Sequence, residues 1–254
     1  MLIHQLSNSN GNFNYNAYIY KNYLWQDHFH SNYELVYVLE GCGQISVNGK
    51  TQTLMAGESI LISPYAVHSL LISESAVWVG VFSEDHITEF SNKYKHVEYS
   101  KFFYDQSVDT FLRQKLFIAQ NPKKYERISY LYAMCDQLLK HAVPTGAEAD
   151  AKLIGKIISY ISKNIMHNIT LKDISDNLGY EYHYFSDLFH RYFSMNFKAF
   201  INVLRCNKAC LLLSDKEKSI TDISLECGFG SIRNFNRAFK LQSGLSPSEY
   251  RNKI

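Results

Sequence analysis

The chain has 254 residues, enough for two domains, and its formal net charge at pH 7 is only +2. No apolar stretch approaches the length of a bilayer span, which excludes a membrane-spanning helix. The two halves differ in charge: residues 1–150 carry a net charge of −4, and residues 151–254 carry +6. The basic second half favours a polyanion such as DNA as its partner.

The cysteines and the start of the chain indicate the cellular compartment. The five cysteines are odd in number and include no Cys-x-x-Cys pair, although Cys206 and Cys210 lie one helical turn apart. Reduced thiols are the simplest interpretation. The polar start, residues 1–8, does not resemble a signal peptide. We therefore expect a cytoplasmic protein that has no membrane partner.

The first third of the chain favours short strands. The candidate strands are rich in β-branched and aromatic residues and lie at 18–20, 34–39, 44–47, 59–62 and 77–82. Turn residues separate them, and Asn48-Gly49 is a strong hairpin dipeptide. Many closely spaced strands predict a β-barrel or jelly roll over residues 1–84.

Residues 85–142 change to a helical pattern, which is clearest at 127–139, where apolar residues recur at helical spacing. The segment 143–152 then has the composition of a linker. Apolar helical faces suit either a dimer interface or a cover for the open side of the barrel.

The last hundred residues repeat one pattern, because residues 170–180 are echoed by residues 219–229. Each copy opens with a hydroxyl residue that is followed three residues later by an acid, as in an N-capped helix. Each copy closes on a glycine, Gly179 or Gly228, which stops the helix and allows a tight turn. The spacing predicts helix-turn-helix motifs at about 170–193 and 219–242.

The second helix of each motif has one apolar face, which begins at Phe185 in the first copy and at Phe235 in the second. In the second copy the opposite face is basic and rich in donors, with Arg233, Asn236, Arg237 and Lys240. The predicted DNA-contacting set also includes the neighbouring Ile232 and Asn234. Arginine can read guanine, asparagine can read adenine, and lysine neutralises phosphate. The alternative is a solvated charged face. The first copy carries His183, Ser186, Asp187 and His190 at the corresponding positions.

These features make residues 153–251 resemble the DNA-binding domain of the AraC family of bacterial transcription regulators. The matching residues are Leu178-Gly179-Tyr180, Arg205, Ala209, Leu212-Leu213, Ile223, Cys227-Gly228-Phe229, the run from Phe235 to Lys240, and the close from Gly244 to Arg251. The resemblance implies two motifs joined by a linker helix, with second helices that enter the major groove about 34 Å apart. It also implies that the helices at 85–142 form a dimer interface.

The first motif departs from the family pattern at two positions. Asp187 stands where the second motif has Arg237, and Glu181 replaces the usual small residue that caps the second helix. A carboxylate repels phosphate, although it can accept a hydrogen bond from cytosine N4. We therefore expect the second motif to dominate the affinity for DNA.

Residues 28–41 look like the first cupin motif. His28, His30, Glu34 and Gly41 have its spacing, and His68 would complete a set of four side chains. In metal-binding cupins these groups hold iron, manganese or zinc. The step from Pro64 to His68 is one residue shorter than usual and lacks a glycine, which leaves the direction of His68 open.

We favour a metal-free barrel that binds a small-molecule effector with a few polar groups in an apolar cavity. The candidate effector residues are His28, His30, Glu34, His68, Trp25 and Tyr18, with Tyr20 and Trp78 as further aromatic walls. These groups suit a sugar, and also aromatic or amide ligands. A metal held by the two histidines and Glu34 of the motif together with His68 is one alternative, and a purely structural barrel is another.

Together the patterns predict an α+β chain: a cupin-like barrel at 1–84, helices at 85–142, a linker at 143–152 and an all-α DNA-binding domain at 153–254. We expect an effector-responsive transcription regulator that is not an enzyme and needs no cofactor. The expected partners are double-stranded promoter DNA, the effector, a second copy of the chain and RNA polymerase. The alternatives are a metal-dependent cupin enzyme and a constitutive regulator with an empty barrel.

Overall fold

The computed structural model describes residues 3–4, 15–95, 97–117, 122–145, 148–193 and 195–253, without the side chains of 3, 4, 148, 149 and 151. Most of the polar start at 1–8, and residues 146–147 of the predicted linker, lie outside this part. The contacts divide the described residues into two compact units, one of residues 15–152 and one of residues 153–253 together with residues 3–4. Within the described ranges, no helix has the length and apolar character needed to cross a lipid bilayer.

The first unit is a β-sandwich of antiparallel strands. One sheet has the order β10-β7-β4-β9-β2, and the other contains β3-β8-β5-β6 as successive neighbours. The strands of this unit are β2 (Tyr15–Lys21), β3 (Leu24–Phe29), β4 (Tyr33–Glu40), β5 (Cys42–Val47), β6 (Lys50–Met55), β7 (Glu58–Ile62), β8 (His68–Ile72), β9 (Ala76–Phe82) and β10 (Phe102–Phe103), and the two-residue strand β1 (Ile3–His4) is grouped with the other unit. The predicted fold class, a cupin-like β region followed by an all-α region, is confirmed.

Strand β4 is buried on both faces for most of its length. Its side chains alternate between the two sides, as in any strand. Val36 and Val38 point into the core between the two sheets. Tyr33, Leu35 and Tyr37 point the other way and enter a second core beneath a layer of helices.

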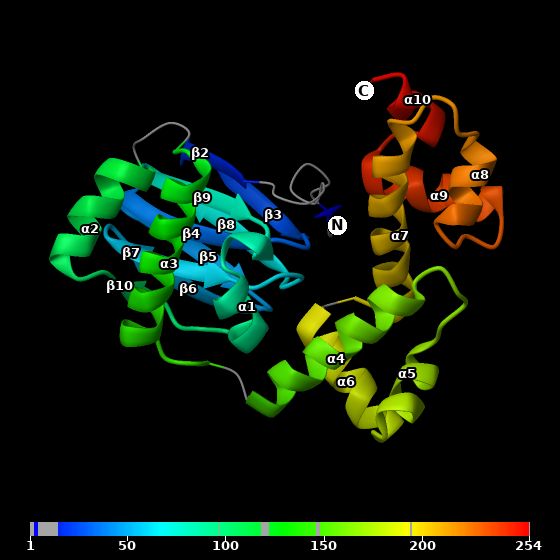
Figure 1. Cartoon of the computed structure of the whole chain (residues 1–254), viewed down its shortest axis with the longest axis horizontal. Helices are drawn as coiled ribbons and strands as arrows, with labels where there is room; N and C mark the ends of the chain where they lie inside the picture. Colours follow the sequence, from blue (N-terminus) through cyan, green and yellow to red (C-terminus); the bar gives the residue numbers. More distant parts are fainter. Residues whose placement is uncertain are drawn as a thin grey trace. The chain divides into compact units, whose positions relative to one another are not determined.

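This layer of helices follows the sandwich in the chain and covers the outer face of the sheet that contains β4 (Figure 1). Its members are η2 (Glu84–His86), α1 (Thr88–Tyr94), α2 (Gln106–Leu112), the π-helical η3 (Arg113–Phe117) and α3 (Lys124–His141). Leu131, Met134 and Leu138 of α3 share a core with Trp78. The hypothesis that Trp78 lines an effector pocket is therefore wrong, because strand alternation turns its ring away from the interior that Val77 and Val79 enter.

Several strands were not predicted from the sequence. Strands β3 and β6 have exposed and largely polar outward residues, so their local pattern is weak and pairing with neighbouring strands decides them. Strand β10 lies inside the predicted helical region, where Phe102 pairs with Ser59 of β7.

The second unit is helical. It contains α5 (Leu171–Leu178), α6 (Tyr182–Phe193), α7 (Phe197–Leu213), α8 (Ile220–Glu226), α9 (Ile232–Ser243) and α10 (Pro247–Arg251), and α4 (Glu148–Asn164) leads into it. Helix α7 joins the pair α5–α6 to the pair α8–α9 (Figure 1). Residues 148–152 of the predicted linker are helical, in keeping with the alanines of that stretch. All five cysteines of the chain are free.

Gly80 of β9 lies under the indole ring of Trp78, and a Cβ atom at residue 80 would come within 2.1 Å of that ring. Since Trp78 is buried, the ring has little room to move. We expect Gly80→Ala to lower the free energy of unfolding of the first unit by about 1–3 kcal/mol through overpacking. Urea unfolding followed by tryptophan fluorescence measures this, because both tryptophans of the chain, Trp25 and Trp78, lie in this unit.

Gly43→Ala is the matched control, since Gly43 is also a strand glycine and a Cβ atom there would meet its nearest neighbour at an ordinary 3.7 Å. An equal loss of stability in the two variants would contradict the close approach at residue 80.

Candidate functional sites

The second helix-turn-helix motif consists of α8 and α9, each started by a serine. The amide of Asp222 donates to Ser219 Oγ at 3.0 Å, and the amide of Asn234 donates to Ser231 Oγ at 3.3 Å. Between the helices Gly228 takes a φ of 82°, and a Cβ atom there would lie 2.9 Å from the Met166 backbone. Both conformation and space therefore require glycine at this turn.

Helix α9 buries one face and exposes the other. Phe235, Ala238 and Phe239 enter a core formed with α7 and α8. The predicted DNA-contacting side chains are all exposed: Ile232, Arg233, Asn234, Asn236, Arg237 and Lys240. Within the described part of the chain, no side-chain hydrogen bond or ion pair engages the three cations of this face. They are therefore available to a ligand outside the unit.

The first motif, α5 and α6, has the same frame. Thr170 and Asp173 form the predicted capping box, and Gly179 ends α5 in the left-handed region with a φ of 73°. Glu181 still caps α6, because its carboxylate accepts a hydrogen bond from the Tyr184 amide at 2.9 Å. The unusual residue at this cap therefore preserves the local fold.

Position by position, α6 and α9 share a buried frame and differ on the exposed face. The predicted apolar residues of α6 are buried: Phe185, Leu188, Phe189 and Tyr192. On the other face His183, Asp187 and His190 are exposed, and Ser186 is half-buried. The two motifs therefore present opposite charges at the positions of Asp187 and Arg237.

Arg205 of α7 is a structural residue that the sequence pattern alone does not explain. Its guanidinium donates to the carbonyl oxygens of Ile165 at 2.9 Å and His167 at 2.8 Å. It also lies over the ring of Phe229, 5.8 Å from the ring centroid. Arg205 thus ties the segment after α4 to the turn of the second motif.

The first unit contains a buried histidine cluster, which comprises His28, His30, Glu34 and His68. One potential ligand atom from each lies within 4.8 Å of the others. Each residue is at most 3% exposed. His28 of β3 faces His68 of β8 as its cross-strand partner, whereas Glu34 comes from β4 in the opposite sheet. The sandwich therefore brings together the four residues that the sequence marked.

His68 joins this cluster despite the short spacing from Pro64. The pairing of β3 with β8 sets its direction. The preceding loop turns without a glycine, because Tyr65 takes a left-handed φ of 67° and its amide donates to the carbonyl of His30 at 2.8 Å. The missing glycine is thus replaced by a strained tyrosine.

A common pattern orients the three imidazoles. Each Nδ1 lies 2.9–3.0 Å from a backbone carbonyl oxygen, at Gln26 for His28, at Asn32 for His30 and at Ala66 for His68. A carbonyl only accepts, so Nδ1 of His28 and of His68 carries a proton, and Nε2 of each faces the interior. Nε2 of His30 lies 3.0 Å from the Glu34 carboxylate and must itself carry a proton to donate to it. The same arrangement orients histidines that ligate metals.

The charges inside the cluster are unequal. Burial lowers the pKa of His28 to about 3 and also lowers that of His30. Burial alone would raise the pKa of Glu34, but His68 and the hydrogen bond with His30, 3.0 Å long, hold it well below its usual range. The Glu34 carboxylate overcomes the effect of burial on His68 and raises its pKa. Glu34 therefore favours the charged form of His68, 3.5 Å away, whereas burial favours the neutral forms of His28 and His30.

These donors also fit a divalent transition metal. Three imidazole nitrogens and one carboxylate oxygen converge in a space protected from water; imidazole suits zinc and iron, and carboxylate suits manganese. A bound cation would replace the proton of His68 as the charge that balances Glu34.

Aromatic side chains lead from the surface toward this cluster. Ring contacts run from Tyr18 through Tyr20 to Trp25, where the Tyr20 and Trp25 centroids are 4.3 Å apart. Trp25 lies 6.1 Å from His28, whereas Tyr18 is at the outer end and is 44% exposed. Tyr23, which packs on Trp25 at 4.8 Å, belongs to the same group, although the strand pattern did not single it out.

Both halves of the chain match known families. Residues 25–82 match the family model described as a cupin domain, and residues 174–253 match the model described as a helix-turn-helix domain. The chain is 32% identical over 98 residues to the melibiose operon regulatory protein of Escherichia coli, across 39% of this chain and 32% of that protein. The match thus spans about a third of that relative's length.

Two further relatives are similar over most of their length. The Msm operon regulatory protein of Streptococcus mutans is 26% identical over 241 residues, which cover 88% of this chain and 85% of that protein. Among solved structures, ToxT of Vibrio cholerae with an unsaturated fatty acid bound has a TM-score of 0.57 at 18% identity, covering 96% of each chain. This last likeness shows the fold alone.

The pairing of Glu34 with His68 can be tested by titration. In Glu34→Gln the carboxylate that raises the pKa of His68 is absent, while its burial remains, so we expect that pKa to fall. Nuclear magnetic resonance titration of the chelator-treated protein measures the ring signals directly. His86 is the control, because Arg127, Ser83, Asp85 and Lys124, rather than Glu34, surround it. An unchanged pKa of His68 in the variant would contradict the pairing.

Proposed function

Because the chain belongs to the AraC family of transcription regulators, we propose that it binds promoter DNA and responds to a small molecule held in its cupin domain. The observation that carries the proposal is the basic outward face of α9, fixed on a capped and fully packed frame. The family is one of regulators rather than enzymes, so the histidine cluster is interpreted as a sensing site.

Helix α9 is the proposed recognition helix. Arg233 and Arg237 can each bind guanine O6 and N7, Asn236 can bind adenine, and Lys240 can neutralise a phosphate. Helix α6 would enter a neighbouring stretch of the major groove in the same way. Its acidic residue, Asp187, supports a weaker role for the first motif.

The proposed effector site is the histidine cluster with its aromatic neighbours. Trp25 is the wall nearest the cluster, and Tyr18 would contact only a ligand that extends to the surface. The name of the melibiose operon regulator supports a sugar, whereas the ToxT structure holds a fatty acid. Buried imidazole and carboxylate groups pair with hydroxyls better than with an acyl chain, which favours the sugar.

Two partners of the regulator stay predictions. The helices at 85–142 could pair two copies of the chain through the outward face of α3, where Tyr125 and Leu139 are exposed. RNA polymerase would be the partner if the regulator activates transcription.

A divalent metal in the cluster is a second candidate, and the cupin family also implies it. The supporting observation is the shared Nδ1 pattern, which aims Nε2 of His28, His30 and His68 at Glu34. A bound metal would supply a Lewis acid that coordinates an oxygen of the effector.

We expect Arg237→Ala to weaken specific DNA binding by about 1–3 kcal/mol and to relax the base preference, as for loss of a bidentate contact. Genome-wide binding of the tagged protein supplies a promoter fragment, and titrations at fixed salt measure the affinity. Asp187→Ala is the matched variant and should have a much smaller effect, or strengthen binding. Equal losses at the two positions would contradict the dominance of the second motif.

If the second candidate holds, protein purified without chelators contains stoichiometric iron, manganese or zinc. His28→Ala, His30→Ala and Glu34→Ala should then each lose the metal, since each removes a ligand atom. His167→Ala, at an exposed histidine of the other unit, should retain it. Elemental analysis measures the content, and a metal-free wild type after growth with all three metals would remove this candidate.

A further inference from the structure

Residues 143–145, here called the exit segment, are held on the first unit just before the chain enters α4. Pro144 forms an antiparallel bridge with Tyr99. The Thr145 amide donates to the Glu98 carbonyl at 2.9 Å, and the Ser100 amide donates to the Val143 carbonyl at 2.8 Å. Whatever shifts residues 98–100 therefore shifts the point from which the chain leaves the sandwich.

Asn48 links this region to the loop before β8. It sits in the β5–β6 turn with a left-handed φ of 48°. Its amide donates to the Val67 carbonyl at 2.8 Å, and its Oδ1 accepts from the Val67 amide at 3.0 Å. Its Nδ2 donates to Glu98 Oε1 at 2.6 Å. One side chain thus contacts both the loop and the residue that holds Thr145.

The same loop reaches the histidine cluster. His68 Nδ1 donates to the carbonyl of Ala66 at 2.9 Å. A ligand that engages Nε2 of His68 acts on a ring whose other nitrogen is fixed to this backbone. These hydrogen bonds, together with the Ala66–Val67 peptide bond and the covalent frame of Glu98, form one continuous path: His68, Ala66, Val67, Asn48, Glu98 and Thr145.

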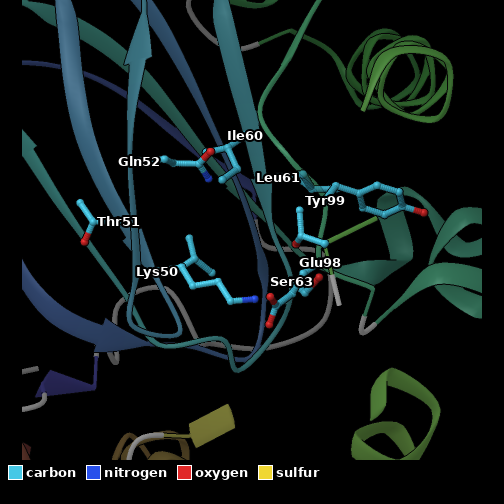
Figure 2. A pocket seen from close by; sticks show the side chains of 10 residues that line it. Lys50, Thr51, Gln52, Ile60, Leu61, Ser63, Glu98 and Tyr99 are labelled. Atoms are coloured by element: carbon cyan, nitrogen blue, oxygen red, sulfur yellow. The ribbon is translucent and has the colours of Figure 1, made fainter. Parts of the chain in front are cut away.

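A cavity of about 170 Å³ lies beside this path and includes Glu98 and Thr145 in its lining. Figure 2 shows Glu98 and Tyr99 across the cavity from Thr51 of β6. The β5–β6 hairpin and the exit segment therefore line a common cavity there, and hydrogen bonds to residues 97 and 98 connect the sandwich to this side of it. The Asn48–Glu98 hydrogen bond joins the hairpin to the residue whose carbonyl holds Thr145, and Ser63 Oγ, just after β7, donates to the neighbouring Val97 carbonyl at 3.1 Å.

We propose that Asn48 and Glu98 couple the histidine cluster to the exit segment, so that engagement of His68 changes how firmly residues 143–145 are held. The inference rests on the proposed function, in which a ligand in the cupin domain controls the DNA-binding unit. Coupling between the histidine cluster and the exit segment requires a structural element whose conformational equilibrium depends on both sites. The hydrogen-bonded path is the element to which we assign this role. The open space beside Glu98 lets its side chain move without repacking a core.

The test is a double-mutant cycle read at the Thr145 amide by hydrogen exchange of the full chain, without DNA or effector. In the wild-type background, His68→Ala should speed exchange at Thr145 by about two- to tenfold. In the Asn48→Ala background the same change should have no effect. His68→Gln is the second perturbation should the alanine variant fail to fold, and amides of β4 report global stability.

Asn22→Ala is the matched control. Asn22 also has a left-handed φ, 51°, and its Oδ1 accepts from the Glu74 amide at 2.6 Å in another turn of the same unit. In that background the response to His68→Ala should persist. The proposal is overturned if His68→Ala leaves the exchange rate of the Thr145 amide unchanged in the wild-type background. It is also overturned if His68→Ala still speeds that exchange in the Asn48→Ala background. Since no DNA is present, this outcome is independent of the Arg237 titration, which tests the proposed function.

Discussion

The burial of both faces of β4 is the constraint on which the first unit depends. Because its side chains alternate, a shift by one residue would exchange the two faces. In the observed register Glu34 enters the interior of the sandwich, and Tyr37 faces the helices, where its hydroxyl donates to Asp109 of α2 at 2.5 Å. The strand that aims the carboxylate also anchors the helical layer, so the site and the scaffold share one register.

That register places a carboxylate where burial opposes its charge. Glu34 stays ionised because His68 and His30 surround it, and burial favours the neutral forms of His28 and His30. The cluster is consequently oriented and electrostatically unequal before any ligand arrives. A hydroxylated ligand and a metal would both use the inward Nε2 atoms, which explains why one geometry supports both candidates.

The second unit shows how one frame can be used for two different purposes. Caps, glycine turns and buried aromatic residues recur in both motifs, and even Glu181 retains a capping hydrogen bond. The exposed positions are free of that constraint, because they contribute little to packing. They can differ as far as Asp187 and Arg237 differ, and affinity for DNA can be adjusted there without changing the fold.

The sequence by itself determined the two motifs, the β character of the first unit and the identity of the cluster residues, since caps, turns and periodicity are encoded within a few neighbouring residues. Tertiary structure decided what depends on partners distant in the chain. Strand pairing turned His68 inward and Trp78 outward. The contact of Asn48 with Glu98 joins residues fifty apart, and no local pattern could reveal it.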